Sequence, residues 1–278
     1  MRRKEPETES MSAATTTRVH LVGAGPGDPE LLTLKSHALI RSADLILHDD
    51  LVSAPVLALA APQALLVNIG KRCGVKKISQ PEINRFMISS ARRGLKVVRL
   101  KSGDPGVFGR LAEELDALEA AGVPYEVVPG ITAGAAAAAS LGVSLTDRRS
   151  SSRIVFVSGH HASENERREK PDWKSLAAED AALVVYMPGR DVTAIARDIL
   201  NAGLSFDTPA VIVSHATTPD QRVWRTTLGE LPNSPLMDAP SILLIGRSLE
   251  RAARHRNAQI LALVDTVNRT DLQRSVSP

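Results

Sequence analysis

The sequence of 278 residues predicts a two-domain α/β protein, with a parallel sheet in its N-terminal half and a mixed sheet in its C-terminal half. Two observations favour this fold class. Short apolar runs alternate with helical patterns in the first half, as in parallel sheets covered by helices. After a serine patch at 150–152, the apolar runs follow one another with little room for helices, which indicates partly antiparallel pairing. We therefore expect domains at 18–149 and 150–247.

The first half contains five predicted strands and the helical patterns between them. Apolar runs predict strands at 18–22, 45–47, 65–69, 96–100 and 125–128. Helical patterns cover 30–44, 80–93, 111–122 and 135–139. In the first of these helices, Leu31, Leu34, Ala38 and Leu39 repeat at helical spacing. In the third, Leu111, Leu115, Leu118 and Ala121 form one face and Gly122 ends the helix.

The second half contains predicted strands at 154–157, 183–187, 209–213, 222–227 and 242–245, with a helix at 192–200. The basic tail at 248–278 includes a possible amphipathic helix at 248–267. Residues 1–17 carry charges but no apolar run, so they are not a secretory signal and are expected to be disordered.

Composition and charge exclude several classes of function. The net charge of +3 resides in the tail, where six arginines and three acidic residues follow from Arg247 onward, and the rest of the chain is neutral. This argues against a nucleic-acid surface, as does an aromatic content of 3%. The longest apolar tract, 131–145, is interrupted and too short to span a membrane. A lone cysteine, Cys73, fits a reducing compartment, so we expect a cytoplasmic protein without membrane or nucleic-acid partners.

The stretch RLKSGDPGVFGR, from Arg99 to Arg110, is the strongest candidate for a site. A predicted buried strand enters it, Ser-Gly-Asp-Pro turns the chain, and a helix follows. Backbone N–H groups at such a turn point outward at a ligand. The two arginines, one lysine and one aspartate around the turn predict a polar, partly anionic ligand.

Other motifs have competing interpretations. The motif GAGPGDP follows a predicted strand, but it is a poor dinucleotide-binding fingerprint, because Gly23, Gly25 and Gly27 alternate and Pro26 has no backbone N–H to donate. Two interpretations of this motif stay open: a structural turn, or a loop that lets another ligand approach the backbone. Asp49, Lys71 and Asp104 each follow a predicted strand end, where a lone carboxylate is often a helix cap. The pair His160-His161 does not predict a metal site, because adjacent side chains point apart and no further ligand has suitable spacing.

Taken together, the motifs form an ordered series over about 18–247. It runs GAGPGDPELLTLK, ADLILHDDLV, GKR, QPEIN, VVRLKSGDPGVFGR, VVPGITA, GVSLTDR, FVSGH, LVVYM, QR and SILLIGR. This series resembles the uroporphyrinogen-III C-methyltransferases of the tetrapyrrole methylase superfamily. The resemblance implies a two-domain homodimer that binds S-adenosylmethionine in a cleft between the domains. It also implies methylation of uroporphyrinogen III on rings A and B to give precorrin-2, for siroheme or cobalamin biosynthesis. This chemistry requires no metal, and we expect no room in the chain for the dehydrogenase and ferrochelatase module that is fused to some siroheme synthases.

The resemblance also assigns roles to residues. The cofactor contacts it implies are Pro26, Ser102, Gly103, Asp104, Val107, Thr132, Ala133, Met187 and Ala216. Catalysis would rest on Asp49 as proton acceptor, Lys71 as proton donor and Arg110. The substrate carries eight carboxylates, and its binding residues would be Arg72, Lys101, Arg110, Glu113 and Arg148, with Arg99 beside them. Ser102, Gly106 and Asp147 stand where the family usually has Gly, Phe and His.

Three rival functions stay open at this point. A later corrin-ring methyltransferase of the same superfamily is disfavoured by GKR followed by QPEIN. A non-catalytic tetrapyrrole or S-adenosylmethionine binding protein is allowed by Ser102 and Asp147. A nicotinamide oxidoreductase is disfavoured by the glycine spacing.

Overall fold

The computed structural model describes residues 16–70, 78–159, 171–189 and 192–250. These residues form two compact units, which we describe separately. The first consists of Leu32–Gly130 with the segment ending at Ala24, and the second consists of Gly25–Leu31 with the chain from Ile131 onward. Several predictions fall outside the described residues: those for Lys71, Arg72, Cys73, His160 and His161, for most of the N-terminal tail and for the C-terminal tail beyond Glu250.

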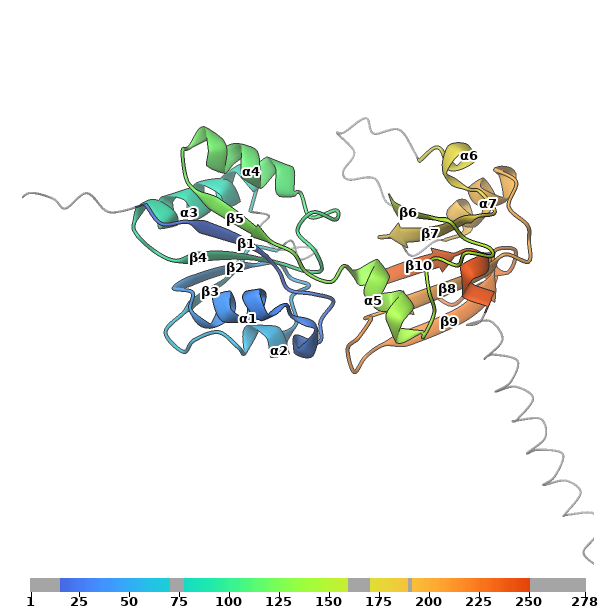
Figure 1. Ribbon diagram of the computed structural model, residues 1–278, viewed down its shortest axis with the longest axis horizontal. Coiled ribbons are helices and arrows are strands. Elements are labelled where there is room, and N and C mark those ends of the chain that lie inside the picture. The colour runs from blue at the N-terminus through green and yellow to red at the C-terminus, as the bar shows by residue number, and fades with distance from the viewer. Residues whose placement is uncertain (1–15, 71–77, 160–170, 190–191, 251–278) are drawn as a thin grey trace, which may run out of the picture. The chain divides into compact units, whose positions relative to one another are not determined.

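The first unit is built on a five-stranded sheet in the order β3-β2-β4-β1-β5, with every pairing parallel (Figure 1). The predicted N-terminal parallel sheet is thus confirmed. Its strands are β1 (Val19–Gly23), β2 (Leu45–His48), β3 (Leu65–Asn68), β4 (Val97–Lys101) and β5 (Tyr125–Val128). Because all five run in the same direction, the loops that follow them gather at one edge of the sheet.

Helices cover both faces of this sheet, with α3 and α4 on one side and α1 and α2 on the other (Figure 1). They are α1 (Leu34–Arg41), α2 (Ala54–Leu57), α3 (Gln80–Arg92) and α4 (Leu111–Ala120). Ser79 and Glu82 form a capping box that starts α3. Helix α4 ends before Gly122, whose φ of +64° suits glycine. Its predicted apolar face is confirmed, since Leu118 is buried and its predicted neighbours pack on the same cluster.

The predicted apolar face of the first helix is wrong at two positions. Leu34 is 91% exposed and Ala38 is exposed as well, whereas Leu39 and Ile40 are buried. The reason at Leu34 is that Thr33 caps the helix, accepting a hydrogen bond from Ser36 N through its side chain, so that α1 begins only at Leu34. The preceding residues Pro29–Leu31 form a separate turn of 3₁₀ helix, η1. The pattern at 30–44 therefore spans two elements.

The second unit holds a five-stranded mixed sheet in the order β6-β7-β10-β8-β9, which confirms the predicted mixed sheet. Its strands are β6 (Arg153–Ser158), β7 (Ala181–Tyr186), β8 (Pro209–Ser214), β9 (Arg222–Thr227) and β10 (Ser241–Ile245). Strands β6 and β7 are parallel, and β10 is antiparallel to both β7 and β8. Consequently β6, β7 and β8 point toward the same edge. The unit's helical elements are α5 (Ala133–Ser140), α6 (Trp173–Leu176), α7 (Thr193–Asn201), η2 (Leu231–Asn233) and η3 (Arg247–Leu249).

Helix α5 belongs to the second unit, although the sequence places a domain boundary only after Arg149. Gly134 lets this helix lie directly on β7, because a Cβ at that position would be 2.4 Å from Val184 Cγ1. The chain therefore passes from one unit to the other at Gly130. The serine patch at 150–152 marks the start of β6 instead.

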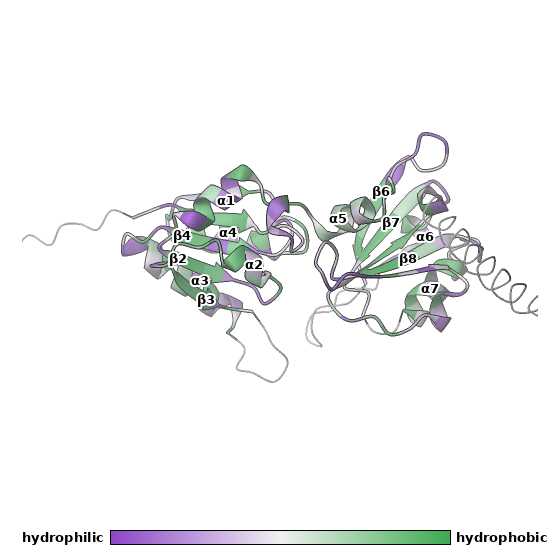
Figure 2. Ribbon diagram, turned by 90° about the horizontal axis from the view of Figure 1, so that it is seen from below, coloured by the Kyte–Doolittle hydropathy of each residue, from purple (hydrophilic) through white to green (hydrophobic). Residues whose placement is uncertain are grey.

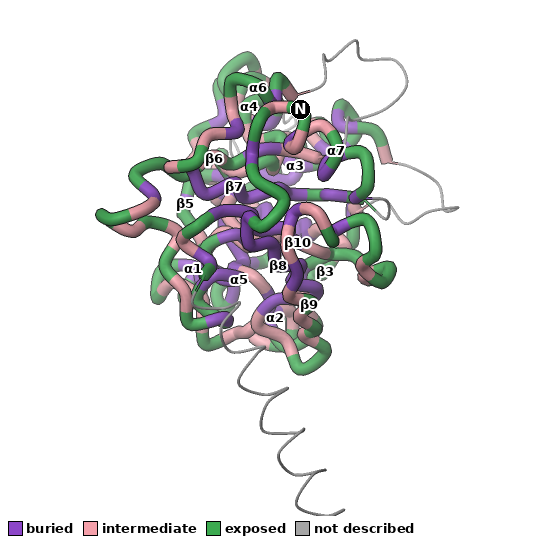
Figure 3. Tube along the Cα trace, turned by 90° about the vertical axis from the view of Figure 1, so that its right-hand side faces the viewer, coloured by how far each residue is buried: buried purple, intermediate pink, exposed green. Residues whose placement is uncertain are grey.

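Each sheet supplies most of the core of its own unit. Hydrophobic residues line β7 and β8 in Figure 2, and the buried residues follow the strands in Figure 3. In the second unit, α6 and α7 cover the face that carries Leu183, Val185 and Leu243. Within the described ranges, no helix has both the length and the apolar character needed to cross a membrane.

Candidate active site

The loops that follow β1, β4 and β5 pack backbone against backbone at the carboxyl edge of the first sheet. A Cβ on Gly130 would lie 2.3 Å from Gly103 O, and a Cβ on Gly23 would lie 2.5 Å from Gly130 N. Real Cβ atoms do not approach backbone so closely. Glycine is therefore required at these positions, and the three loops present backbone groups rather than side chains to a ligand.

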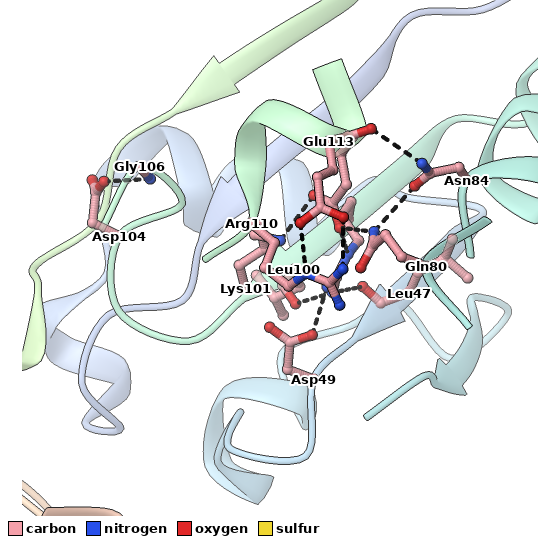
Figure 4. Close-up of polar contacts among 12 residues, drawn as sticks. Leu47, Asp49, Gln80, Asn84, Leu100, Lys101, Asp104, Gly106, Arg110 and Glu113 are labelled. Atoms are coloured by element: carbon pink, nitrogen blue, oxygen red, sulfur yellow. Dashed lines mark hydrogen bonds and ion pairs between the residues drawn. The ribbon is translucent and has the colours of Figure 1, made fainter. Parts of the chain in front are cut away.

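Asp104 joins two of these loops. Its Oδ1 accepts a hydrogen bond from Gly106 N at 2.8 Å, as Figure 4 shows, and its Oδ2 accepts one from Gly130 N at 3.0 Å. Val107 N also donates to the carbonyl of Asp104, at 3.2 Å. The structure thus brings Ser102, Gly103, Asp104 and Val107 into one turn, in which the Asp104 carboxylate fixes the loop.

Arg110 and Glu113, both predicted to face the substrate, form a bidentate ion pair. Arg110 donates from Nε to Glu113 Oε1 at 2.7 Å and from Nη2 to Oε2 at 2.6 Å, and both side chains are about half exposed. Arg110 caps α4 with a left-handed φ of 55°, and Phe108 has a φ of 54°. For non-glycine residues this conformation costs about 1–2 kcal/mol each. Such strain is concentrated at functional sites.

Asp49 follows β2, the neighbour of β4 in the sheet, and its carboxylate contacts the buried Arg99. Arg99 Nη2 donates to Asp49 Oδ1 at 2.6 Å, and the Asp49 side chain is 30% exposed (Figure 4). Burial disfavours the charged guanidinium, but the carboxylates of Asp49 and Glu114 outweigh this effect and raise the pKa of Arg99. Arg99 therefore stays positively charged beneath a partly exposed carboxylate.

The prediction that Lys101 binds the substrate is wrong, because its side chain is buried inside the first unit. It is 1% exposed, and its Nζ donates to Glu114 Oε2 at 2.8 Å. Burial and the nearby charge of Arg99 lower the pKa of Lys101. Lys101 and Arg99 both form ion pairs with Glu114 beneath α4, inside the first unit, where substrate carboxylates do not reach them.

The second unit gathers the other predicted cofactor residues at the carboxyl edge of its own sheet. Met187 follows β7 with a φ of 50° and is 49% exposed. Ala216 follows β8 between two left-handed residues, His215 and Thr217. Gln221 holds this loop, since its Oε1 accepts a hydrogen bond from Thr217 N at 2.7 Å.

Tyr186, at the end of β7, connects the start of α5 to the same edge. Its hydroxyl lies 2.7 Å from Thr132 Oγ1 and accepts a hydrogen bond from Gly134 N at 3.0 Å. The loop around Pro26 also belongs here, because a Cβ on Gly27 would lie 2.7 Å from Thr218 Cγ2. The edge of this unit thus collects Pro26, Thr132, Ala133, Met187 and Ala216.

Replacing Tyr186 with phenylalanine should lower the affinity for S-adenosylmethionine several-fold and the free energy of unfolding by about 1–3 kcal/mol, because the buried Gly134 N–H loses its acceptor. Calorimetric titration and thermal unfolding measure the two effects. The protein's other tyrosine is the matched control: Tyr125 donates to Glu119 at the surface, so Tyr125→Phe should change neither quantity appreciably. Equal effects of the two substitutions would contradict the role given to Tyr186.

Arg148, a predicted substrate ligand, lies away from these residues. It precedes β6, and it lines a polar hollow of about 290 Å³ with Glu179, Asp180 and Arg247, beside the amino ends of β6 and β7. Within the second unit this is the edge opposite to Met187 and Ala216. Arg148 is therefore not brought together with the cofactor residues of this unit.

Asp147, which stands where the family usually has His, forms an ion pair with a neighbouring residue. Arg149 donates to it from Nε at 2.9 Å and from Nη2 at 2.6 Å, and its backbone N–H donates to Oδ1 at 2.9 Å. The Arg149 side chain, followed by its backbone N–H, lowers the pKa of Asp147 to about 2. The negative charge that this departure introduces is therefore paired within its own turn.

Sequence reasoning missed Glu114, Tyr186 and Gln221. A signal existed for Glu114, because it falls on the apolar face of its helix between Leu111 and Leu118, where an acidic residue needs a buried partner. No local pattern indicates Tyr186 or Gln221, since their partners come from other elements.

Comparisons with known proteins show the family of this chain. A family model described as tetrapyrrole (corrin/porphyrin) methylases matches residues 18–232. The chain is 42% identical over 232 residues to the uroporphyrinogen-III C-methyltransferase of Bacillus subtilis, covering 82% of this chain and 90% of that protein. It is 43% identical over 249 residues to the siroheme synthase of Tolumonas auensis, covering 89% of this chain and 50% of that one. The chain thus spans about half the length of that siroheme synthase.

Solved structures give the same result. The uroporphyrin-III C-methyltransferase of Thermus thermophilus, complexed with S-adenosyl homocysteine, matches with a TM-score of 0.71 and 39% identity, over 84% of this chain and 93% of that one. A cobalt precorrin-4 methyltransferase matches with a TM-score of 0.75 and 30% identity, over 86% of this chain and 98% of that one. From the family match and these relatives, we conclude that the chain belongs to the tetrapyrrole (corrin/porphyrin) methylase family.

Proposed function

We propose that this chain transfers methyl groups from S-adenosylmethionine to uroporphyrinogen III, on rings A and B, to give precorrin-2. The relatives from Bacillus subtilis and Thermus thermophilus support this substrate and this donor. One structural observation carries the proposal for this chain. Asp49 follows β2 and the Ser102–Asp104 turn follows β4, and these strands are parallel neighbours. A proton acceptor and a backbone-lined loop for the donor therefore lie at the same edge.

The predicted cofactor residues suit S-adenosylmethionine. Gly23 and Gly130 have no room for a side chain, because a Cβ on either would lie against backbone atoms. Such loops supply N–H and carbonyl groups for the donor's amino-acid and adenosine parts. Met187 adds an exposed apolar side chain from the second unit. When bound, S-adenosylmethionine supplies a methyl group on a positively charged sulfur, and the protein's main contribution is to position it.

The cleft between the domains is proposed as the donor site on the resemblance alone. Within the first unit, Gly130 N donates to Asp104, and within the second, Thr132 Oγ1 bonds to Tyr186.

Asp49 is proposed to accept the proton that leaves the methylated ring carbon. That carbon gains positive character as the methyl group arrives, which a nearby carboxylate stabilises. Arg99 orients Asp49 through an ion pair to its Oδ1. Arg110 is proposed to bind substrate carboxylates together with Glu113, and Lys71 and Arg72 remain the predicted proton donor and substrate ligand.

The proposal is tested by anaerobic incubation of the pure protein with S-adenosylmethionine and uroporphyrinogen III, followed by mass spectrometry of the tetrapyrrole. The expected product carries two additional methyl groups, with two molecules of S-adenosylhomocysteine formed for each. An unchanged tetrapyrrole mass would overturn the proposal. A parallel incubation with cobalt precorrin-4 tests the rival reaction that the second solved structure suggests.

We further propose that the protein is a cytoplasmic homodimer that serves siroheme or cobalamin biosynthesis. The siroheme synthase of Tolumonas auensis supports the first destination, and the cobalt precorrin-4 methyltransferase, a cobalamin biosynthetic enzyme, supports the second. Analytical ultracentrifugation of the purified chain should give twice the monomer mass. Complementation of strains blocked in either pathway tests the destination.

A further inference from the structure

Glu114 is a fully buried carboxylate to which the proposed reaction gives no role. It lies on α4 with 0% of its surface exposed. Three donors surround it: Arg99 Nε at 2.8 Å, Lys101 Nζ at 2.8 Å and Gln80 Nε2 at 3.3 Å. A buried charge with this many partners is kept in one place and one orientation.

The contacts form a chain from Glu114 through Arg99 to Asp49. Arg99 uses Nε for Glu114 and Nη2 for Asp49, while Nη1 donates to the carbonyls of Leu47 and Leu100 at 3.4 and 3.1 Å. Because the guanidinium is planar and rigid, fixing Nε also fixes the direction in which Nη2 points. Arg99 cannot turn away from Asp49 without breaking its bond to Glu114.

We infer that Glu114 is a positioning residue for Asp49: it anchors Arg99, and Arg99 holds the carboxylate that accepts the proton. This inference rests on the proposed function for the chemical role of Asp49. Among the described residues, only Oδ1 of the Asp49 carboxylate has a hydrogen-bond partner, so Oδ2 is the atom left to receive the proton. The anchored Arg99 thus sets which oxygen is engaged and which is available.

The charges around Asp49 are balanced, and Glu114 is needed for the balance. Strand β4 contributes Arg99 and Lys101, α4 contributes Glu114, and β2 contributes His48, whose Nδ1 lies 3.1 Å from the Asp49 carbonyl. From α3, the neutral amide of Gln80 faces the cluster. Without the negative charge of Glu114, two cations would face Asp49 alone. Its carboxylate would become a weaker base, because nearby positive charge stabilises the ionised form.

The decisive variant is Glu114→Gln, which keeps the size of the side chain and removes its charge. We expect kcat to fall by about tenfold or more, because the proton acceptor is misplaced and less basic. The acidic limb of the kcat–pH profile should move to lower pH by about one unit. The KM for S-adenosylmethionine should change little. Asp116→Asn is the matched control, since it removes one carboxylate from an exposed position of the same helix and should leave kcat and the limb in place.

Two further variants separate charge from orientation. Glu114→Asp keeps the charge but shortens the reach, so kcat should fall while the limb stays where it is. Lys101→Met combined with Glu114→Gln leaves one cation, Arg99, facing one anion, Asp49. The acidic limb of the kcat–pH profile should therefore return to its wild-type position while kcat stays low. This double variant also keeps the test available if Glu114→Gln fails to fold, because it buries no unpaired cation.

A second readout does not depend on methylation. The carboxyl carbon of Asp49, labelled with ¹³C and assigned by comparison with Asp49→Asn, should titrate at lower pH in Glu114→Gln than in the wild-type protein. If the wild-type protein methylates no tetrapyrrole, the proposed function fails, and this titration still tests the positioning. The inference is overturned if Asp49 titrates alike in both proteins, if Asp116→Asn causes the same shift, or if the double variant recovers full kcat.

Discussion

Replacing Asp49 with asparagine should slow methyl transfer by about 10²–10⁴-fold, the range that a general base contributes. Asparagine has the same shape but cannot take a proton at neutral pH. The affinity for S-adenosylmethionine should stay close to that of the wild-type protein, because Asp49 follows β2 whereas the loops proposed to bind the donor follow β1, β4 and β5. Folding should also persist, since Arg99 keeps its ion pair with Glu114. Single-turnover kinetics with saturating donor measure the rate, and calorimetric titration measures the affinity.

The neighbouring carboxylate provides the control for this substitution. Asp50 lies in the same loop, and its Oδ1 accepts a hydrogen bond from Asn68 Nδ2 at 2.7 Å. Asp50→Asn removes the same charge one residue away and keeps an oxygen for Asn68, so the transfer rate should fall far less. If Asp49→Asn turned over at the wild-type rate, the proton would leave by another route and Asp49 would lose its assigned role.

Local patterns predict the fold well because the central strands of both sheets are buried and therefore form continuous apolar runs. Strand β9 begins and ends at the predicted residues, and the apolar face of α4 lies on the core as its spacing indicates. The direction of the strands then places the loops. Since residues that follow parallel strands share an edge, the turn after β4 and the aspartate after β2 could be brought together from the sequence alone.

The same rule explains the position of Arg148. Arg148 precedes a strand, whereas the candidate site residues follow strands, so its position at the opposite edge could have been inferred. Lys101 could not be placed in this way. Whether a lysine at a strand end faces a ligand or a buried partner depends on the element above it, and here α4 brings Glu114 onto its ammonium group. Helix α5 likewise changes unit because of a contact between Gly134 and β7, which no local pattern contains.

Replacing Gly130 with alanine should abolish most of the binding of S-adenosylmethionine and lower the free energy of unfolding by about 3 kcal/mol, the upper range for overpacking a close contact. The new methyl group would lie 2.3 Å from Gly103 O and 2.9 Å from Gly23 Cα. Both neighbours are backbone atoms at strand ends, and they cannot rotate away as a side chain does. Relief therefore requires the loops after β1 and β4 to separate from the loop after β5.

This separation reaches the proposed site directly. Asp104 Oδ2 accepts the Gly130 N–H, so displacement of Gly130 also loosens the turn that follows β4. A misplacement of about 1 Å in such loops is enough to cost about 10²-fold in rate. Calorimetric titration with S-adenosylhomocysteine and chemical denaturation measure the two losses.

Substitution of a second glycine, Gly122, distinguishes the effect of a steric contact from the effect of backbone strain. Gly122 has a φ of +64°, and a methyl group added to it would have no neighbouring atom within 4 Å, so Gly122→Ala meets only the cost of the left-handed backbone. That cost is about 1–2 kcal/mol, and the affinity for S-adenosylhomocysteine should be unchanged. Gly130 has no positive φ, so any loss in Gly130→Ala comes from the contact itself. If Gly130→Ala bound S-adenosylhomocysteine as tightly as Gly122→Ala, the close packing of the three loops would not be what forms the donor site.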